Sequence, residues 1–473
     1  MTESNEPEIT FFAKQERIYP KRVWGRYRKL KWVAMVITLG IYYLAPFIRW
    51  DRGPNAPDQA ILIDLPNRRA YWFFIEIWPQ EVYFLTGILI LAAVALFFVT
   101  SLFGRVWCGY FCPQTVWTDL FVWVERIVQG DRNKRKKLRE GPWTFEKLWK
   151  MAATHFLWLV IAWVTAGSFV LYFNDAPTLV WSFFELNVSS TVLAFIAGLT
   201  FSTYVMAGFA REQVCIYMCP YARFQSAMFD SDTLIIGYDE VRGEKRGKHK
   251  KGEPWDGRGH CVDCTACVQV CPMGIDIRDG LQMECIACGL CVDACNNIMD
   301  KVELPRGLIR YDTERRMSLP EAERSKKVVH LMRPRTFYYV VILALVGGVM
   351  LYALITRAPQ ELHVLHDRNP LFVALSDGSI RNGYVLKILN KTHDHRRYSV
   401  SVEGLENVVL EIQGAGDIQP ENLYVEADSV GSFHITVSAA VEAGPPVPVT
   451  FILIDKQSGE RSVYESIFVS ERG

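Results

Sequence analysis

Five long apolar stretches, separated by polar and charged segments, dominate the first three quarters of the chain. Each is close to the length that a helix needs to cross a bilayer, and charged residues gather at its ends. An aromatic stretch at 71–78 is typical of a segment at the membrane interface. The pattern predicts five transmembrane helices, at 32–48, 82–103, 153–173, 188–210 and 337–356.

The last quarter of the chain has a different pattern, with short alternating or β-branched segments between turn residues such as Asp-Gly and Asn-Gly. Several short strands within roughly one hundred residues predict an immunoglobulin-like β-sandwich over 358–473. Its histidines at 363, 366, 393 and 395 could bind a metal, but exposed surface histidines are the favoured interpretation. The strands are predicted at 384–390, 397–402, 408–412, 432–437 and 449–454.

Lysine and arginine are unevenly distributed between the segments that join the apolar stretches. They gather in 1–31 and in 131–140, whereas 174–187 has neither. The positive-inside rule therefore predicts that the N-terminus, the 104–152 loop and the 211–336 segment are cytoplasmic. With five spans, the C-terminal domain then lies outside.

Composition agrees with a membrane protein. The 473 residues have a mean hydropathy of +0.09 and are 13% aromatic, which is too apolar for an ordinary soluble enzyme. The net charge of +1 by itself says nothing about a nucleic-acid or acidic partner, and we expect no nucleic-acid partner, because the one candidate for such a site has another interpretation. We interpret the basic run 241–254 as a solvated tether or a contact with anionic lipid.

Eight cysteines form two runs with the spacing C-x2-C-x2-C-x3-C, which is the ligand pattern of a bacterial two-cluster ferredoxin. In that pattern the fourth cysteine of each run serves the other cluster. The runs predict two [4Fe–4S] clusters, although Asn296 stands where the second run would have proline. Structural zinc and disulfides are the less favoured alternatives. The predicted ligand sets are Cys261, Cys264, Cys267 with Cys295, and Cys285, Cys288, Cys291 with Cys271.

The other four cysteines form two C-x3-C-P pairs, Cys108 with Cys112 and Cys215 with Cys219, directly after the second and fourth apolar stretches. The i, i+4 spacing predicts that both sulfurs of a pair lie on one helical face. The repeat predicts that the two pairs face each other across a pseudo-twofold axis. Soft thiolates select Cu(I), zinc or iron–sulfur clusters, and ordinary buried packing is the alternative.

A few further residues are weaker candidates. His155 is an ionisable residue inside the third apolar stretch. A functional role and a role in helix packing explain its position equally well. Met206 and Met218 could assist the thiols as thioether ligands, although most such methionines only pack. The chain has no C-x-x-C-H motif for haem and no dinucleotide fingerprint. Electrons must then come from another protein or from a cofactor without a sequence signature.

Together these features resemble the CcoG/FixG/RdxA family of membrane polyferredoxins, accessory proteins of cbb3-type cytochrome c oxidase. The resemblance rests on the basic N-terminus, five spans, both C-x3-C-P pairs, the eight-cysteine core with C-V-D-A-C-N at 291–296, and the tail segment 367–384. It implies reduction of Cu(II) to Cu(I) for the oxidase copper centre. The eight cysteines would bind the clusters, and Cys108, Cys112, Cys215 and Cys219 would handle copper.

The resemblance also implies partners and a location. The partners would be a copper chaperone or transporter, oxidase subunits and an unknown electron donor, with a homodimer as a possibility. The location would be the bacterial inner membrane. Two other functions stay open: an electron carrier linked to quinone or to a periplasmic reductase, and a non-catalytic assembly scaffold.

The predicted architecture is a multi-domain integral membrane protein with five transmembrane helices, an inserted two-cluster ferredoxin-like module and a C-terminal immunoglobulin-like β-sandwich. The predicted parts are an arm at 1–31, a membrane domain at 32–210, a cytoplasmic segment at 211–336 with its cluster core at 255–300, a fifth helix at 337–357, and the sandwich at 358–473.

Overall fold

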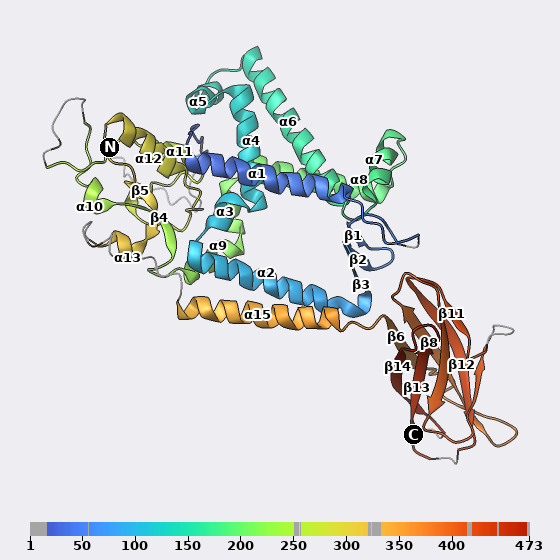
Figure 1. Ribbon diagram of the computed structural model, residues 1–473. Helices are drawn as coiled ribbons and strands as arrows, with labels where there is room; N and C mark the ends of the chain where they lie inside the picture. Colours follow the sequence, from blue (N-terminus) through green and yellow to red (C-terminus); the bar gives the residue numbers. More distant parts are fainter. Residues whose placement is uncertain are drawn as a thin grey trace, which may run out of the picture. The chain divides into compact units, whose positions relative to one another are not determined.

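The computed structural model describes residues 17–54, 56–249, 255, 257–319, 323, 333–413, 419–441 and 444–470. Two predicted basic segments lie partly outside the described residues: 1–16 of the N-terminal arm, and 250–254 of the basic run 241–254. The described part contains five helices that are long and apolar enough to cross a membrane (Figure 1). They are α1 (Arg26–Leu44), α2 (Val82–Phe103), α6 (Phe145–Val170), α8 (Ser190–Val205, with a wide turn Met206–Ala210) and α15 (Pro334–Ile355).

Helices α1 and α6 begin earlier than the apolar pattern predicts. Their first turns are polar, so hydropathy cannot detect them although the backbone is already helical. Thr144 marks the true start of α6, where its side chain accepts a hydrogen bond from the Lys147 backbone N–H at 3.2 Å.

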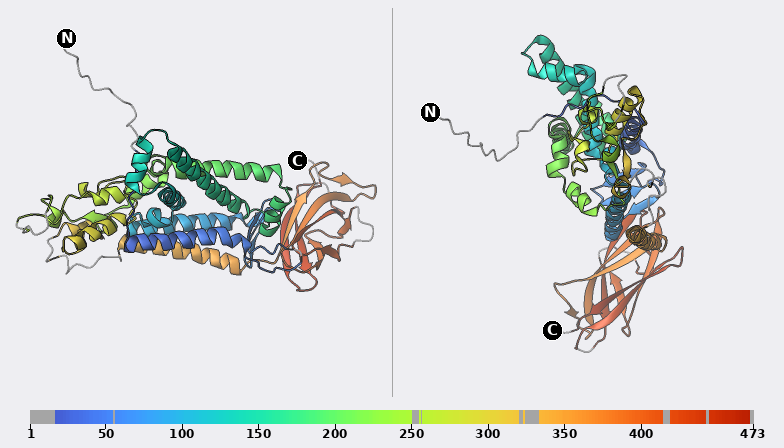
Figure 2. Two further views of the ribbon diagram at one scale, coloured as in Figure 1. Left: turned by 90° about the horizontal axis from the view of Figure 1, so that it is seen from above. Right: turned by 90° about the vertical axis from the view of Figure 1, so that its left-hand side faces the viewer.

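The chain divides into two compact units, one of residues 1–48 and 60–350, the other of residues 49–59 and 351–473. In the first unit α2 and α15 run side by side (Figure 2). The rings of Phe98 and Tyr339 lie 6.3 Å apart at one point of this contact. At another, a Cβ atom on Gly87 would lie 2.0 Å from the Met350 sulfur, so a larger residue at this position would force the Met350 side chain to move.

The aromatic stretch at 71–78 is part of a small antiparallel sheet. Tyr71 is buried and Trp72 exposed, as alternation along a strand requires. The Asp64 carboxylate accepts hydrogen bonds from Asn67 and closes the first turn. The strands are β1 (Ile61–Asp64), β2 (Arg69–Trp72) and β3 (Ile75–Ile77), in the order β1-β2-β3.

Short helices fill the segments between the membrane helices. Helix α4 packs on α6, where Phe121 stacks on Trp158 with ring centroids 5.2 Å apart and the Trp158 Nε1–H donates to the Phe121 carbonyl. The short helices are α3 (Val106–Tyr110), α4 (Pro113–Gln129), α5 (Arg132–Glu140), α7 (Ala176–Phe184), a wide turn Val214–Met218, and α9 (Pro220–Met228).

The ferredoxin-like module extends beyond the predicted core of 255–300. Strand β4 (Leu234–Tyr238) pairs antiparallel with β5 (Ile309–Thr313), and these flanking strands close the module from both ends of the sequence. Its buried core includes Ile236, Met299 and Leu308 together with several cysteines. The helices are α10 (Glu240–Gly243), α11 (Ala266–Val270), α12 (Leu290–Lys301) and α13 (Glu314–Met317).

The second unit is the immunoglobulin-like sandwich, and all five predicted strands are present in it. One sheet has the order β10-β12-β8-β6 with β7 on β8, and the other β11-β9-β13-β14. Tyr384, Leu386 and Phe451 are fully buried in its core. The strands are β6 (Gln360–His366), β7 (Val373–Ala374), β8 (Ile380–Asn390), β9 (Arg396–Glu403), β10 (Val409–Ile412), β11 (Leu423–Val425), β12 (Ser429–Ala439), β13 (Val447–Asp455) and β14 (Arg461–Phe468).

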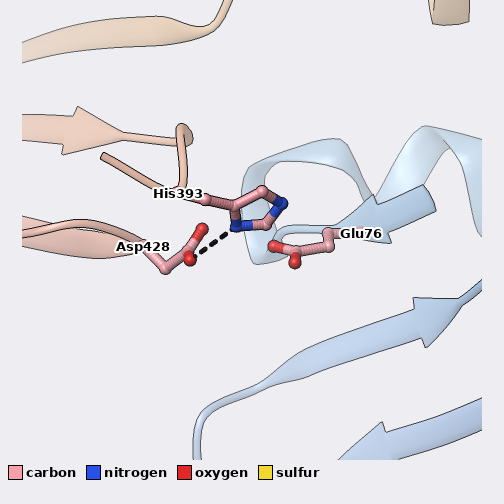
Figure 3. A group of neighbouring side chains, drawn as sticks. All are labelled: Glu76, His393 and Asp428. Carbon is pink, nitrogen blue, oxygen red and sulfur yellow. Dashed lines mark hydrogen bonds and ion pairs between the residues drawn. The ribbon is translucent and has the colours of Figure 1, made fainter. Parts of the chain in front are cut away.

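The sandwich histidines make ordinary polar contacts within this unit. His393 Nδ1 lies 2.8 Å from Asp428 Oδ2 (Figure 3). His366 Nε2 lies 2.6 Å from Asn382 Oδ1. Each of these two histidines therefore has a polar partner in its own unit.

Candidate metal centres

The structure places the eight ferredoxin-type cysteines around two cavities. Each cavity has the crossed composition that the spacing predicts, because the fourth cysteine of each run turns to the cavity of the other run. Cys261, Cys264, Cys267 and Cys295 line the first cavity. Cys271, Cys285, Cys288 and Cys291 line the second, together with Cys267.

The two ligand loops have the same backbone conformation. The third position of each run is left-handed, with φ of +53° at Asp263 and +51° at Ala287. The fifth is also left-handed, with φ of +54° at Thr265 and +75° at Gly289. Left-handed residues other than glycine are uncommon and cluster at ligand-binding loops. Their recurrence at matching positions shows that the two loops are copies of one structural element.

The pairing and the separation of the sulfurs bear on which alternative they fit. All twelve cysteines are free thiols, which argues against the disulfide alternative. Among the described residues, three cysteine sulfurs nowhere lie within 4.8 Å of one another. A tetrahedral zinc ion with bonds of about 2.3 Å would draw its sulfurs to about 3.8 Å from each other. The sets are therefore too open for one zinc ion.

Burial keeps these thiols protonated unless a metal binds. It is the main cause that raises the pKa of Cys267, Cys271 and Cys295 to about 12. It also raises the pKa of Cys285 to about 11. Iron would supply the positive charge that ionises them, and iron–sulfur clusters are held by thiolates. The chemistry of a bound cluster is the storage of single electrons.

The four remaining cysteines come together as one group. The pKa of Cys215 is raised to about 12, mainly by burial. The negative charge that its neighbours carry as thiolates raises it further, and these neighbours are Cys112, Cys108 and Cys219. Burial and then Cys112 likewise raise the pKa of Cys108 to about 11. The Cys108 thiol also lies 3.5 Å from Gln225 Oε1.

The expectation that each pair shares one helical face is wrong. Cys108 lies in α3, but Cys112 is extended, with φ −60° and ψ 127°, and α4 begins after it. Cys219 is likewise extended, with φ −79° and ψ 111°, between a wide turn and α9. Both precede a proline, which disfavours helical conformation in the preceding residue. The helix is therefore interrupted between the two sulfurs of each pair.

The membrane-side thiols pack directly against the second ferredoxin cavity. Cys108 and Cys215 contact a buried apolar cluster that contains Cys288, Ile286 and Met273. A Cβ atom on Gly109 would lie 2.6 Å from the Ile286 carbonyl oxygen, so this position requires glycine.

Comparison with known proteins extends these observations to the whole chain. Residues 210–314 match a family model described as a 4Fe-4S dicluster domain, and 85–135 match a 4Fe-4S binding domain. Residues 350–471 match the immunoglobulin-like fold at the C-terminus of FixG, a putative oxidoreductase by its description. The nitrogen fixation protein FixG of Rhizobium meliloti is 47% identical, and the match covers 97% of this chain and 93% of that protein.

The chain belongs to the FixG/RdxA family. Protein RdxB of Cereibacter sphaeroides is 50% identical over 88% of this chain and 87% of its own length. RdxA of the same organism is 46% identical over 92% of both. This FixG/RdxA family member is therefore an iron–sulfur redox protein with several membrane spans and an immunoglobulin-like C-terminal domain.

The structure of this FixG/RdxA family member also describes the weaker candidates. His155 Nδ1 lies 2.9 Å from the Tyr204 hydroxyl, and its ring packs edge-on against Trp158, which accounts for it as a packing residue. Met206 and Met218 are exposed. The sequence did not reveal Arg105, Tyr110 or Gln225, whose roles depend on contacts with distant segments.

The ferredoxin-like module also caps the first membrane helix. Asp293, buried in α12, accepts hydrogen bonds from the backbone N–H groups of Tyr27 at 3.2 Å and Arg28 at 2.8 Å. The Gly25 at the start of α1 has no side chain that could do this. The aspartate of C-V-D-A-C-N therefore joins the cluster-bearing helix to the membrane helix.

We expect Asp293→Ala to destabilise the first unit by about 1 kcal/mol, since a lost cap of this kind costs that much. Asp293→Asn is the control, because asparagine caps as well as aspartate. Thermal unfolding of the iron-loaded protein in detergent measures both. Equal losses in the two variants would show that the charge, not the cap, is what matters.

Proposed function

We propose that this protein is a membrane-bound electron-transfer protein that reduces Cu(II) to Cu(I), for assembly of the copper centre of a cbb3-type cytochrome c oxidase. The observation that carries the proposal is the packing of Cys108 and Cys215 against the loop of Cys288. A thiol group that could bind copper then lies beside a site that stores single electrons.

The chemistry of the two sites is complementary. Thiolate sulfur favours Cu(I) over harder ions, so binding and reduction reinforce each other. Each Cu(II) takes one electron, which is the unit that an iron–sulfur cluster releases. Two of the four membrane-side thiols would be enough to hold the ion, because Cu(I) accepts two thiolate ligands. Two-coordinate Cu(I) is readily passed on to another thiol protein.

The charge distribution supports an orientation. The basic segments favour a cytoplasmic N-terminus and cytoplasmic clusters, with the sandwich in the periplasm of the inner membrane. The sandwich has no cysteine, in keeping with an oxidising compartment. We propose that it docks oxidase subunits or the copper chaperone or transporter.

Cu(II) added to anaerobic, dithionite-reduced and desalted protein tests the proposal. We expect reoxidation of the clusters, seen by absorbance, to match the Cu(I) captured by a specific chelator. A variant with Cys108, Cys112, Cys215 and Cys219 changed to serine should lose both signals, because no thiolate remains to bind copper. A Met206→Leu, Met218→Leu variant is the matched control. Equal rates in the thiol variant and the wild type would refute the copper site.

A second candidate has one observation in its favour. The 4Fe-4S binding domain matched at 85–135 contains no cysteine except Cys108 and Cys112. The four thiols could then hold a third cluster, in an electron carrier linked to quinone or to a periplasmic reductase. The iron and acid-labile sulfide content of the thiol variant decides between the two candidates. If the thiols handle copper, both contents equal those of the wild type. If the thiols hold a third cluster, the variant has one third less of each.

A further inference from the structure

Three features of the first unit suggest an order for the two ferredoxin sites. The first is the exposed cysteine ligand of the first set. The second is the packing of the membrane-side thiols against the second set, and the third is a buried arginine that bonds to the segments of both. Each concerns only one of the two sites.

The first set reaches the surface. Cys264 is the only exposed cysteine of the twelve, all of which the structure describes. Its neighbours Asp263 and Thr265 are exposed as well. A reductant in solution can therefore approach this set more closely than the second, whose four cysteines are buried or half-buried.

The second set is held against the membrane-side thiols by hydrogen bonds. The Tyr110 hydroxyl, two residues after Cys108, donates to the Cys288 carbonyl at 3.0 Å. The Tyr311 hydroxyl donates to the Ala287 carbonyl at 2.5 Å on the same loop. The Tyr110 bond fixes the loop that carries Cys285 and Cys288 beside α3, and the Tyr311 bond holds the same loop on β5 of its own module.

Arg105 joins the three segments that meet here. Its side chain is buried, and its guanidinium donates to the Met283 carbonyl, two residues before Cys285, and to the Ala222 carbonyl, three residues after Cys219. Through these two bonds the guanidinium joins the loop of the second set to the segment that carries the membrane-side thiols. One buried cation thus lies beside both the thiols and the second set.

We propose that electrons pass in a fixed order, from the Cys264 edge of the first set to the second set and then to the membrane-side thiols, with Arg105 as the positioning residue of the last step. The proposal rests on the proposed function for its final acceptor. One electron arrives from a one-electron reductant at the first set and leaves from the second set to Cu(II), which becomes Cu(I). No bond is broken and no proton is transferred.

A redox titration followed by electron paramagnetic resonance tests the placement of Arg105 without copper. Reduction adds a negative charge to a cluster, so we expect Arg105→Gln to shift one cluster signal to lower potential and leave the other unchanged. Arg105→Lys should restore the potential. Cys264→Ser should alter the signal that Arg105→Gln leaves unchanged.

Arg278→Gln is the matched control, because this arginine is paired with Asp263 and Asp276 beside the first set. It should shift the signal that Cys264→Ser alters. Iron content shows that each variant is fully loaded. Two results would overturn the placement of Arg105 beside the second set. In one, Arg105→Gln shifts the same signal that Cys264→Ser alters, and in the other it shifts neither cluster signal.

Rapid mixing with Cu(II) tests the order itself. We expect Cys288→Ala, which removes a ligand of the second set, to leave the first-set signal reduced after copper is added. Fast reoxidation of the first set in this variant would overturn the order. If Cu(II) oxidises no cluster even in the wild type, the proposed function fails, and the copper-free titration still decides the position of Arg105.

Discussion

Alanine in place of Glu125 is expected to lower the free energy of unfolding of the first unit by about 3–5 kcal/mol, the cost of leaving buried charges without their partner. The Glu125 carboxylate in α4 is buried and pairs with three arginines. The distances are 3.1 Å to Arg17, 2.8 Å to Arg135 and 2.6 Å to Arg211. These residues come from the N-terminal arm, from α5 and from the segment after α8, so the variant releases three elements together.

Reversible unfolding in mixed detergent micelles measures this loss. Glu146→Ala is the control, because Glu146 makes an exposed pair with Lys150, and exposed pairs contribute little to stability. A loss of the same small size in both variants would show that the arginines find other partners.

The same carboxylate should make stability depend on pH. Burial by itself would raise the pKa of Glu125, but the charges of Arg211, Arg135 and Arg17 outweigh it and hold the pKa below its usual value. The contribution of Glu125 is therefore complete above the usual pKa of a glutamate and is lost as the pH falls through the lower pKa of the folded state. The Glu125→Ala variant should lack this part of the acid dependence.

Removal of iron is the second change with a large expected effect. We expect anaerobic chelation to unfold 234–313 while the sandwich stays folded, since metal binding is part of the folding free energy of such small modules. Cys261, Cys267 and Cys295 belong to the buried core of the module, and two cavities lie among its cysteines. Without a cluster, nothing offsets the left-handed residues of both ligand loops.

Hydrogen exchange followed by mass spectrometry measures this directly. Peptides of 234–313 should lose protection, and those of 360–468, which contain no cysteine, should keep it. Unchanged protection in the module after iron loss would show that its apolar core suffices for folding.

The sequence predicted the parts that depend on local patterns. The spacing of the eight cysteines led to the two crossed sets, and alternation led to β8, β9, β10, β12 and β13 of the sandwich. It failed where a neighbouring residue changed the backbone, as Pro113 and Pro220 do beside Cys112 and Cys219. It also missed β4 and β5, which pair across a long insertion, and the sandwich strands β6, β7, β11 and β14.

The roles of Arg105 and Asp293 could not be predicted from any local pattern. In the sequence, Arg105 is one of several basic residues near the ends of the predicted spans. Its role appears only when Met283 and Ala222 come to lie beside it. Contacts of this kind depend on the tertiary fold.

The cap that Asp293 provides has a consequence for how the protein is made. Arg28 and Asp293 are 265 residues apart in the chain, so the ribosome completes α1 long before it reaches the residue that caps it. The start of the first helix stays uncapped until α12 has formed, and α12 carries Cys291 and Cys295. Insertion of iron is thereby linked to completion of the membrane domain, and a chain that never received its clusters keeps a frayed first helix that quality-control proteases can recognise.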